Sequence, residues 1–163
     1  MNDMTYEGQN YTEALTVKYA ADIQKLSKYI HYFENKKGKD VAGDYDGDQG
    51  KSSLRFPVYD STLLSFAKEA GETSLIDPNY IYKYRQYRIT TEKAEKDAIQ
   101  DAKPRDLDLL RAILSRYVLE GRYKSVRWVE ATERGIFHDV LQKLVDLYNF
   151  VKVERNPGLP GGM

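Results

Sequence analysis

The 163-residue sequence contains no cysteine, which excludes disulfide bonds, thiolate nucleophiles and cysteine metal sites. It also lacks an excess of charge of either sign, because 25 lysines and arginines balance 25 aspartates and glutamates. A dedicated nucleic-acid-binding protein usually carries a basic excess, so the balance argues against that role and leaves only a local basic patch open. The length suits one domain, which can bury a sufficient core without cross-links.

Long apolar runs are missing as well. No stretch approaches the roughly 18 residues of a membrane-spanning helix, and the N-terminal MNDMTYEGQN lacks the basic-then-apolar pattern of a signal peptide. We therefore expect a cytoplasmic protein without a membrane partner.

Recognisable catalytic motifs are also absent from the sequence. There is no glycine-rich phosphate loop, no Gly-x-Ser-x-Gly turn, and no kinase or metalloprotease signature. The only histidines are His31 and His138, whereas a zinc site needs three or four ligands. We expect surface or hydrogen-bonded histidines, no metal and no cofactor, and we regard enzymatic activity of an unrecognised type as the least favoured function.

An acidic, apolar-poor segment covers residues 36–55, KKGKDVAGDYDGDQGKSSLR. Asp44, Asp46 and Asp48 alternate as in a calcium loop, but a calcium loop counted from Asp44 needs glycine at the position of Gln49 and glutamate at that of Arg55. The segment is therefore predicted to be a flexible, solvated loop rather than a calcium site.

Helical periodicity dominates the rest of the chain. Apolar side chains recur at steps of three and four along residues 11–35 and again along 107–118, where they predict a central core helix. Gly121 interrupts that pattern, and Gly135 ends the next one. We predict a mainly α fold, a compact bundle of about five to six helices. The predicted organisation is a single helical domain over 1–150, comprising a first helix at 11–35, the loop at 36–55 and a helical core at 56–150, followed by a tail at 151–163.

Two stretches mix basic and aromatic residues, as binding sites for proteins and for nucleic acids both do. They are NYIYKYRQYR at 79–88 and RYVLEGRYKSVRW at 116–128. In the second stretch, Tyr117 and Val118 complete one helix, and Val126 and Val129 give the next helix its inner face. Trp128 joins or borders that face. The candidate partner-binding residues are Lys83, Arg85, Tyr87, Arg88, Arg116, Arg122, Tyr123, Lys124, Arg127 and Trp128.

The segment 109–144, LLRAILSRYVLEGRYKSVRWVEATERGIFHDVLQKL, resembles the family catalogued as domain of unknown function 6508. The resemblance extends over about residues 54–148 and includes the upstream FPVYDSTLLSFAKEA and LIDPNY segments. One departure is that Gly121 precedes Arg122-Tyr123 and no glycine closely follows them. The positions that match are Pro57, Tyr59, Asp77, Tyr80, Arg116, Glu120, Arg122, Tyr123, Trp128, Gly135, Ile136, Leu141 and Leu144.

The resemblance implies a helical fold but no known activity or site residues. Genes of this family are similar to those often seen in bacterial and phage accessory regions. That similarity leaves an adaptor or inhibitor role open. We expect a non-enzymatic helical module that binds another protein or itself, and a nucleic-acid-binding module that uses the same residues is the alternative.

Overall fold

The computed structural model describes residues 11–38 and 61–155, and these residues form helices and turns without any strand. The mainly α fold expected from the sequence is therefore confirmed, with more helical elements than the five to six predicted. In chain order the elements are a π-helical turn η1 (Ala14–Lys18), α2 (Ala20–Ser27), α3 (Ile30–Lys36), α4 (Ser61–Gly71), α5 (Tyr80–Gln86), α6 (Glu92–Asp101), a 3₁₀ turn η2 (Pro104–Asp106), α7 (Leu107–Glu120), α8 (Val126–Glu133) and α9 (Ile136–Arg155).

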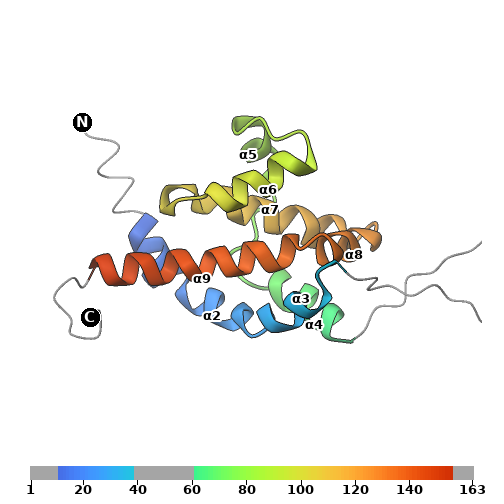
Figure 1. Cartoon of the computed structure of the whole chain (residues 1–163), viewed down its shortest axis with the longest axis horizontal. Coiled ribbons are helices and arrows are strands. Elements are labelled where there is room, and N and C mark those ends of the chain that lie inside the picture. The colour runs from blue at the N-terminus through green and yellow to red at the C-terminus, as the bar shows by residue number, and fades with distance from the viewer. Residues whose placement is uncertain (1–10, 39–60, 156–163) are drawn as a thin grey trace, which may run out of the picture.

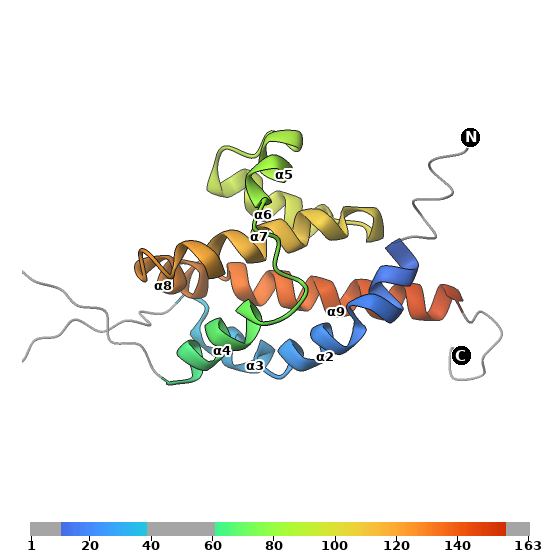
Figure 2. The same ribbon diagram turned by 180° about the vertical axis from the view of Figure 1, so that it is seen from behind.

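Two long helices form the middle of the molecule. In Figure 1, α7 and α9 run antiparallel to one another, and α8 connects their adjacent ends. The helices α2, α3 and α4 cover one side of this pair, whereas α5 and α6 cover the other, as the view from behind also shows (Figure 2). The hydrophobic core lies between these layers, because each helix turns one apolar stripe toward α7 and α9.

The predicted first helix at 11–35 is divided. A hydrogen bond of 2.7 Å from the Tyr19 amide to the Ala14 carbonyl closes a π-type turn, and the Tyr29 amide donates to Leu26 at 3.0 Å in a tighter turn. The prediction of one continuous helix was wrong because these turns adjust the direction of the chain. The predicted stripe nevertheless packs inward, since Leu15, Ile23 and Phe33 are buried.

Three phenylalanines join segments that lie far apart in the sequence. The ring centroids of Phe33 in α3 and Phe66 in α4 are 4.7 Å apart, and Phe137 in α9 lies 5.3 Å from Phe33 and 4.9 Å from Phe66. All three side chains are fully buried. The cluster holds α3 and α4 to the start of α9, since aromatic pairs add edge-to-face attraction to the burial of their area.

The ends of the predicted loop and tail need correction. Lys36 is the last residue of α3 rather than part of the loop, and the amide of Gly38 donates to the Glu133 carbonyl of α8 at 2.7 Å. Residues 44–55, where the sequence predicts a solvated loop rather than a calcium site, lie outside the described residues. Helix α9 continues to Arg155 instead of ending at 150, because Val151 still packs against the core.

Within the described residues, no helix is long and apolar enough to cross a membrane.

Candidate functional site at the α7–α8 joint

The sequence 116–128 covers the end of α7, the beginning of α8 and the turn between them, which we call the joint (residues 121–125). Gly121 ends α7, as the sequence predicts, and is buried beneath the Trp128 indole, so a side chain at this position would collide with the ring. The indole Nε1 donates to the Val118 carbonyl at 3.1 Å. Trp128 thus lies at the edge of the core and fixes the angle between the two helices.

Behind the joint lies a buried carboxylate that the sequence analysis did not select. Glu95 of α6 is 1% exposed and accepts three hydrogen bonds. The donors are the Tyr84 hydroxyl at 2.6 Å, the Tyr117 hydroxyl at 2.7 Å and Nη1 of Arg116 at 2.6 Å. A buried carboxylate requires hydrogen-bond donors of this kind, because it has lost its contacts with water.

The two tyrosines retain their protons as donors. Burial, together with the negative charge of Glu95 and the hydrogen bonds to it, raises the pKa values of Tyr84 and Tyr117 above the ordinary tyrosine value. Both hydroxyls therefore remain protonated at neutral pH and hold the carboxylate in place. We call Glu95, Tyr84, Tyr117 and Arg116 the Glu95 network.

A second carboxylate extends this network toward the surface. Glu120, the last residue of α7, accepts from the Tyr80 hydroxyl at 2.9 Å and lies 3.2 Å from Nε of Arg127. Nε of Arg116 lies 3.6 Å away on the same carboxylate, and Arg127 also pairs with Glu130 at 2.9 Å. The charges of Arg116 and Arg127, two of the candidate partner-binding residues, are thus neutralised by acids.

The network forms the wall of a cleft between α5, α6, α7 and α8, with a volume of about 380 Å³. Arg134 and Glu92 stand at its rim and pair at 3.4 Å. Three arginines and three glutamates line the cleft, so its formal charge is balanced. Glu95, the most buried of these acids, is fully engaged by its three donors within the protein.

The joint itself presents three consecutive side chains to solvent, namely Arg122, Tyr123 and Lys124. Tyr123 is 91% exposed, and Val126, which the sequence placed on the inner face of α8, is 45% exposed. Val129 is buried as expected. We call residues 122–126, of which all but the half-buried Ser125 are exposed, together with the adjoining Tyr80 and Leu119 the joint surface.

A small hollow opens beside Tyr123 with a volume of about 250 Å³. It shares Tyr80 and Glu120 with the larger cleft, so the two concavities adjoin across the Tyr80–Glu120 hydrogen bond. Its lining consists of Tyr80, Leu119, Glu120, Arg122 and Tyr123.

The candidate residues on α5 and in the turn after it lie apart from both concavities. Lys83 donates to Gln86 at 3.2 Å, and the Tyr87 hydroxyl donates to Asp106 of η2 at 3.0 Å. Burial and then the Asp106 hydrogen bond raise the pKa of Tyr87 to about 12. Arg85 and Arg88 are exposed, and none of the four lines the cleft or the small hollow. These four candidate residues are therefore not continuous with the joint surface, whereas Tyr80 of the same stretch lines both concavities.

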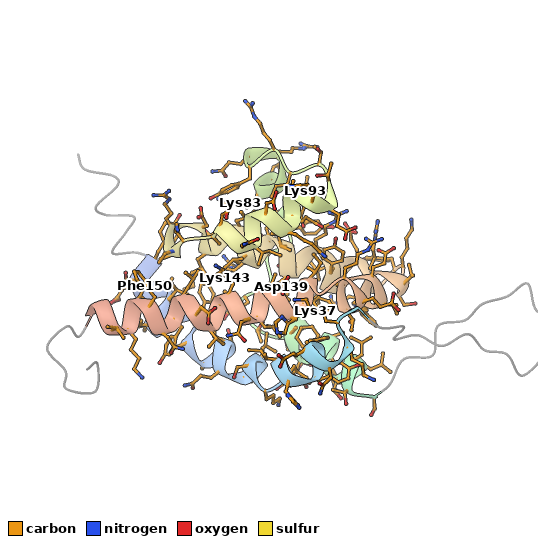
Figure 3. All side chains as sticks on the ribbon, viewed as in Figure 1. Lys37, Lys83, Lys93, Asp139, Lys143 and Phe150 are labelled. Atoms are coloured by element: carbon orange, nitrogen blue, oxygen red, sulfur yellow. The ribbon has the colours of Figure 1, made fainter. Side chains whose placement is uncertain are left out.

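Neither histidine occupies a metal site within the described part of the chain, where no group of three or more potential ligands occurs. His31 is exposed and contacts Asn35 at 3.2 Å. Nδ1 of His138 lies 2.9 Å from Asp139, which also pairs with Lys37 at 2.8 Å. In Figure 3, Lys37 and Asp139 approach one another between α3 and α9, so this contact ties the end of α3 to α9.

Comparison with known proteins gives one match. No curated protein and no solved structure matches the chain. The model of a family of unknown function, DUF6508, matches residues 18–150, which is most of the sequence and includes the joint and the Glu95 network. The chain therefore belongs to the DUF6508 family.

Proposed function

We propose that this chain is a helical protein-interaction module that binds a partner protein through the joint surface. The observation that carries the proposal is the 91% exposure of Tyr123 between two exposed cations and next to a hollow. Arginine and aromatic side chains supply much of the energy at protein interfaces, and a tyrosine loses little conformational entropy when it becomes fixed.

The rigid support behind the joint also favours this proposal. Trp128 and the Glu95 network hold the ends of α7 and α8, so the joint surface is fixed before a partner arrives. A preformed surface lowers the ordering cost of association. An adaptor or inhibitor role in the cytoplasm is the form of the proposal that fits a small cysteine-free module with one contact surface.

Photocrosslinking tests the proposal directly. Tyr123 is replaced by p-benzoylphenylalanine, and the full chain is irradiated in lysate of the cells from which it derives. Tyr82, which is 66% exposed on α5 and lines neither concavity, provides the matched control position. We expect a discrete protein adduct from position 123 that is missing from position 82. Equal adduct patterns at both positions, or no adduct at position 123, would contradict the proposal.

Two other outcomes of the same experiment are informative. An adduct of twice the chain mass identifies the partner as a second copy, and light scattering then checks the oligomeric state. Nucleic-acid binding is tested with labelled single- and double-stranded DNA and RNA. Binding that falls steeply with added salt would support the nucleic-acid alternative, because cations that neutralise phosphates release counterions.

A further inference from the structure

The basic residues at this end of the molecule fall into two groups. Arg116, Arg127 and Arg134 each pair with a glutamate of the cleft or its rim. Over the described residues, by contrast, neither Arg122 nor Lys124 pairs with a carboxylate. Arg122 extends across the backbone of Gly71 at the end of α4, and Lys124 is exposed. Among the residues that the structure describes, the joint therefore carries two positive charges without an acidic partner.

The small hollow lies next to these charges. Its volume of about 250 Å³ is below the roughly 300–1,000 Å³ of typical small-molecule sites. Tyr80, Leu119 and Tyr123 supply apolar surface to its lining, and Glu120 is already engaged by Tyr80 and Arg127. The hollow is thus of a size and polarity to receive a single aliphatic or aromatic side chain.

We propose that the joint surface recognises an acidic segment of a partner protein, with one apolar side chain in the small hollow and carboxylates at Arg122 and Lys124. This inference rests on the proposed function and names the chemistry of the partner. The proposal is carried by the juxtaposition of an apolar hollow with two exposed cations that have no acidic partner among the described residues. A bound partner would exclude water from these cations, and a charge that loses its hydration needs an opposite charge.

A nucleic acid fits this arrangement less well. Phosphate binding is strengthened by many cations along one track, whereas the joint offers two. The exposed arginines of the other predicted stretch, Arg85 and Arg88, lie away from the hollow on α5 and the turn after it. The neighbouring cleft adds no net positive charge, since its arginines are balanced by glutamates.

Selection from a phage library of random dodecapeptides, with the full-length chain as bait, tests the proposal without assuming a partner. We expect the enriched peptides to share aspartate or glutamate on both sides of an aromatic or aliphatic residue. Their affinity, measured by fluorescence anisotropy, should fall with rising ionic strength.

Variants then locate the binding. Arg122→Glu and Lys124→Glu should each weaken the enriched peptide about ten-fold or more, because charge-assisted bonds are replaced by repulsion. The matched control is Arg105→Glu, an exposed arginine in η2 before the opposite end of α7, which should leave affinity unchanged. Tyr123→Ser should also weaken binding, with thermal unfolding unchanged, because the ring is exposed.

Several outcomes would overturn the proposal. They are failure to enrich any peptide, a consensus without acids, equal loss of binding in the Arg105→Glu control, and tighter binding of a DNA dodecamer than of the peptide. A protein adduct at position 123 combined with a non-acidic consensus would leave the interaction module standing and remove only the acidic recognition. Loss of both adduct and peptide binding would remove the two together.

Discussion

At the scale of single residues, Glu95 shows how a charge can be held in the interior of a small helical protein. Its carboxylate accepts hydrogen bonds from two tyrosine hydroxyls and one guanidinium, which belong to residues on α5 and α7. Removal of a buried partner in such a group leaves the others unsatisfied, which costs more than the intact interaction contributes. We therefore expect substitution of Glu95 to lower the free energy of unfolding and to leave the exposed surface unchanged.

Glu95→Ala should lower the free energy of unfolding by roughly 3–5 kcal/mol, because Tyr84, Tyr117 and Arg116 lose their shared acceptor and Arg116 keeps only its longer contact with Glu120. Urea denaturation measures the change. Glu92→Gln on the same helix is the matched control, since its pair with Arg134 is exposed and contributes within about 1 kcal/mol. Equal effects of the two substitutions would contradict the structural role assigned to Glu95.

The contact between Gly121 and Trp128 leads to a second prediction at this scale. Gly121→Ala should cost about 1–3 kcal/mol, because the added methyl group collides with the indole. In a Trp128→Ala background, which itself should cost roughly 3 kcal/mol, that penalty should disappear. A double-mutant cycle by chemical denaturation measures the coupling. Additive effects of the two substitutions would show that the glycine is not required by the ring.

At the scale of elements, α2 and α4 are connected by a polar contact at the surface of the core. The hydroxyl of Tyr29, between α2 and α3, donates to Glu69 of α4 at 2.7 Å, and Lys28 pairs with the same carboxylate at 3.1 Å. The pKa of Glu69 is lowered below its ordinary value of 4.5, and the hydrogen bond from Tyr29 is the largest cause. The contact fixes α4 beside α2 next to the phenylalanine cluster.

This contact should be sensitive to acid. Because the folded state lowers the pKa of Glu69, its contribution to stability is present above pH 4.5 and is lost as the pH falls through the folded-state pKa. The difference in unfolding free energy between the wild type and Glu69→Gln should therefore shrink below pH 4.5. Urea denaturation across the acidic range checks this. A difference independent of pH would contradict the assignment.

At the scale of the whole molecule, the helices on both sides of α7 and α9 share one hydrophobic core. The phenylalanine cluster anchors α3 and α4 at one side, whereas the Glu95 network anchors α5 and α6 at the other. Both anchors end on the central helices. Loss of either side should therefore weaken the other, as expected for a cooperative unit.

The single tryptophan provides a test of that cooperativity. Trp128 reports on the joint through its fluorescence, whereas far-ultraviolet circular dichroism reports on all helices. We expect the two signals to give the same midpoint in urea. Separate midpoints would indicate that the α5–α8 side unfolds independently of the rest.

Much of the fold could be predicted from the sequence. The spacing of apolar residues along 107–118 predicted α7 nearly as observed, and Gly121 and Gly135 marked real helix ends. The π-type turn at Tyr19 and the extension of α9 to Arg155 could not be predicted, because both depend on packing against other helices. Local periodicity carries no information about that packing.

The candidate site was predictable in part. The run Arg122-Tyr123-Lys124 stands out in the sequence and is exposed in the structure. Glu95 was missed, although its spacing of four residues to Ile99 placed it on the inner face of α6 and could have marked it as buried. Its partners Arg116 and Tyr117 lie more than twenty residues further along the chain. Local sequence patterns therefore could not predict that these residues contact Glu95.

The sequence by itself determined the helical class, the apolar stripes and the break at Gly121, because these follow from side-chain spacing and backbone preference within a few residues. Only the tertiary structure decided which basic residues are neutralised. Arg116 and Arg127 meet glutamates because α5, α6, α7 and α8 converge on the cleft, whereas Arg122 and Lys124 meet none within the described residues. Charge pairing depends on distances between helices, and these are set by packing of the whole core.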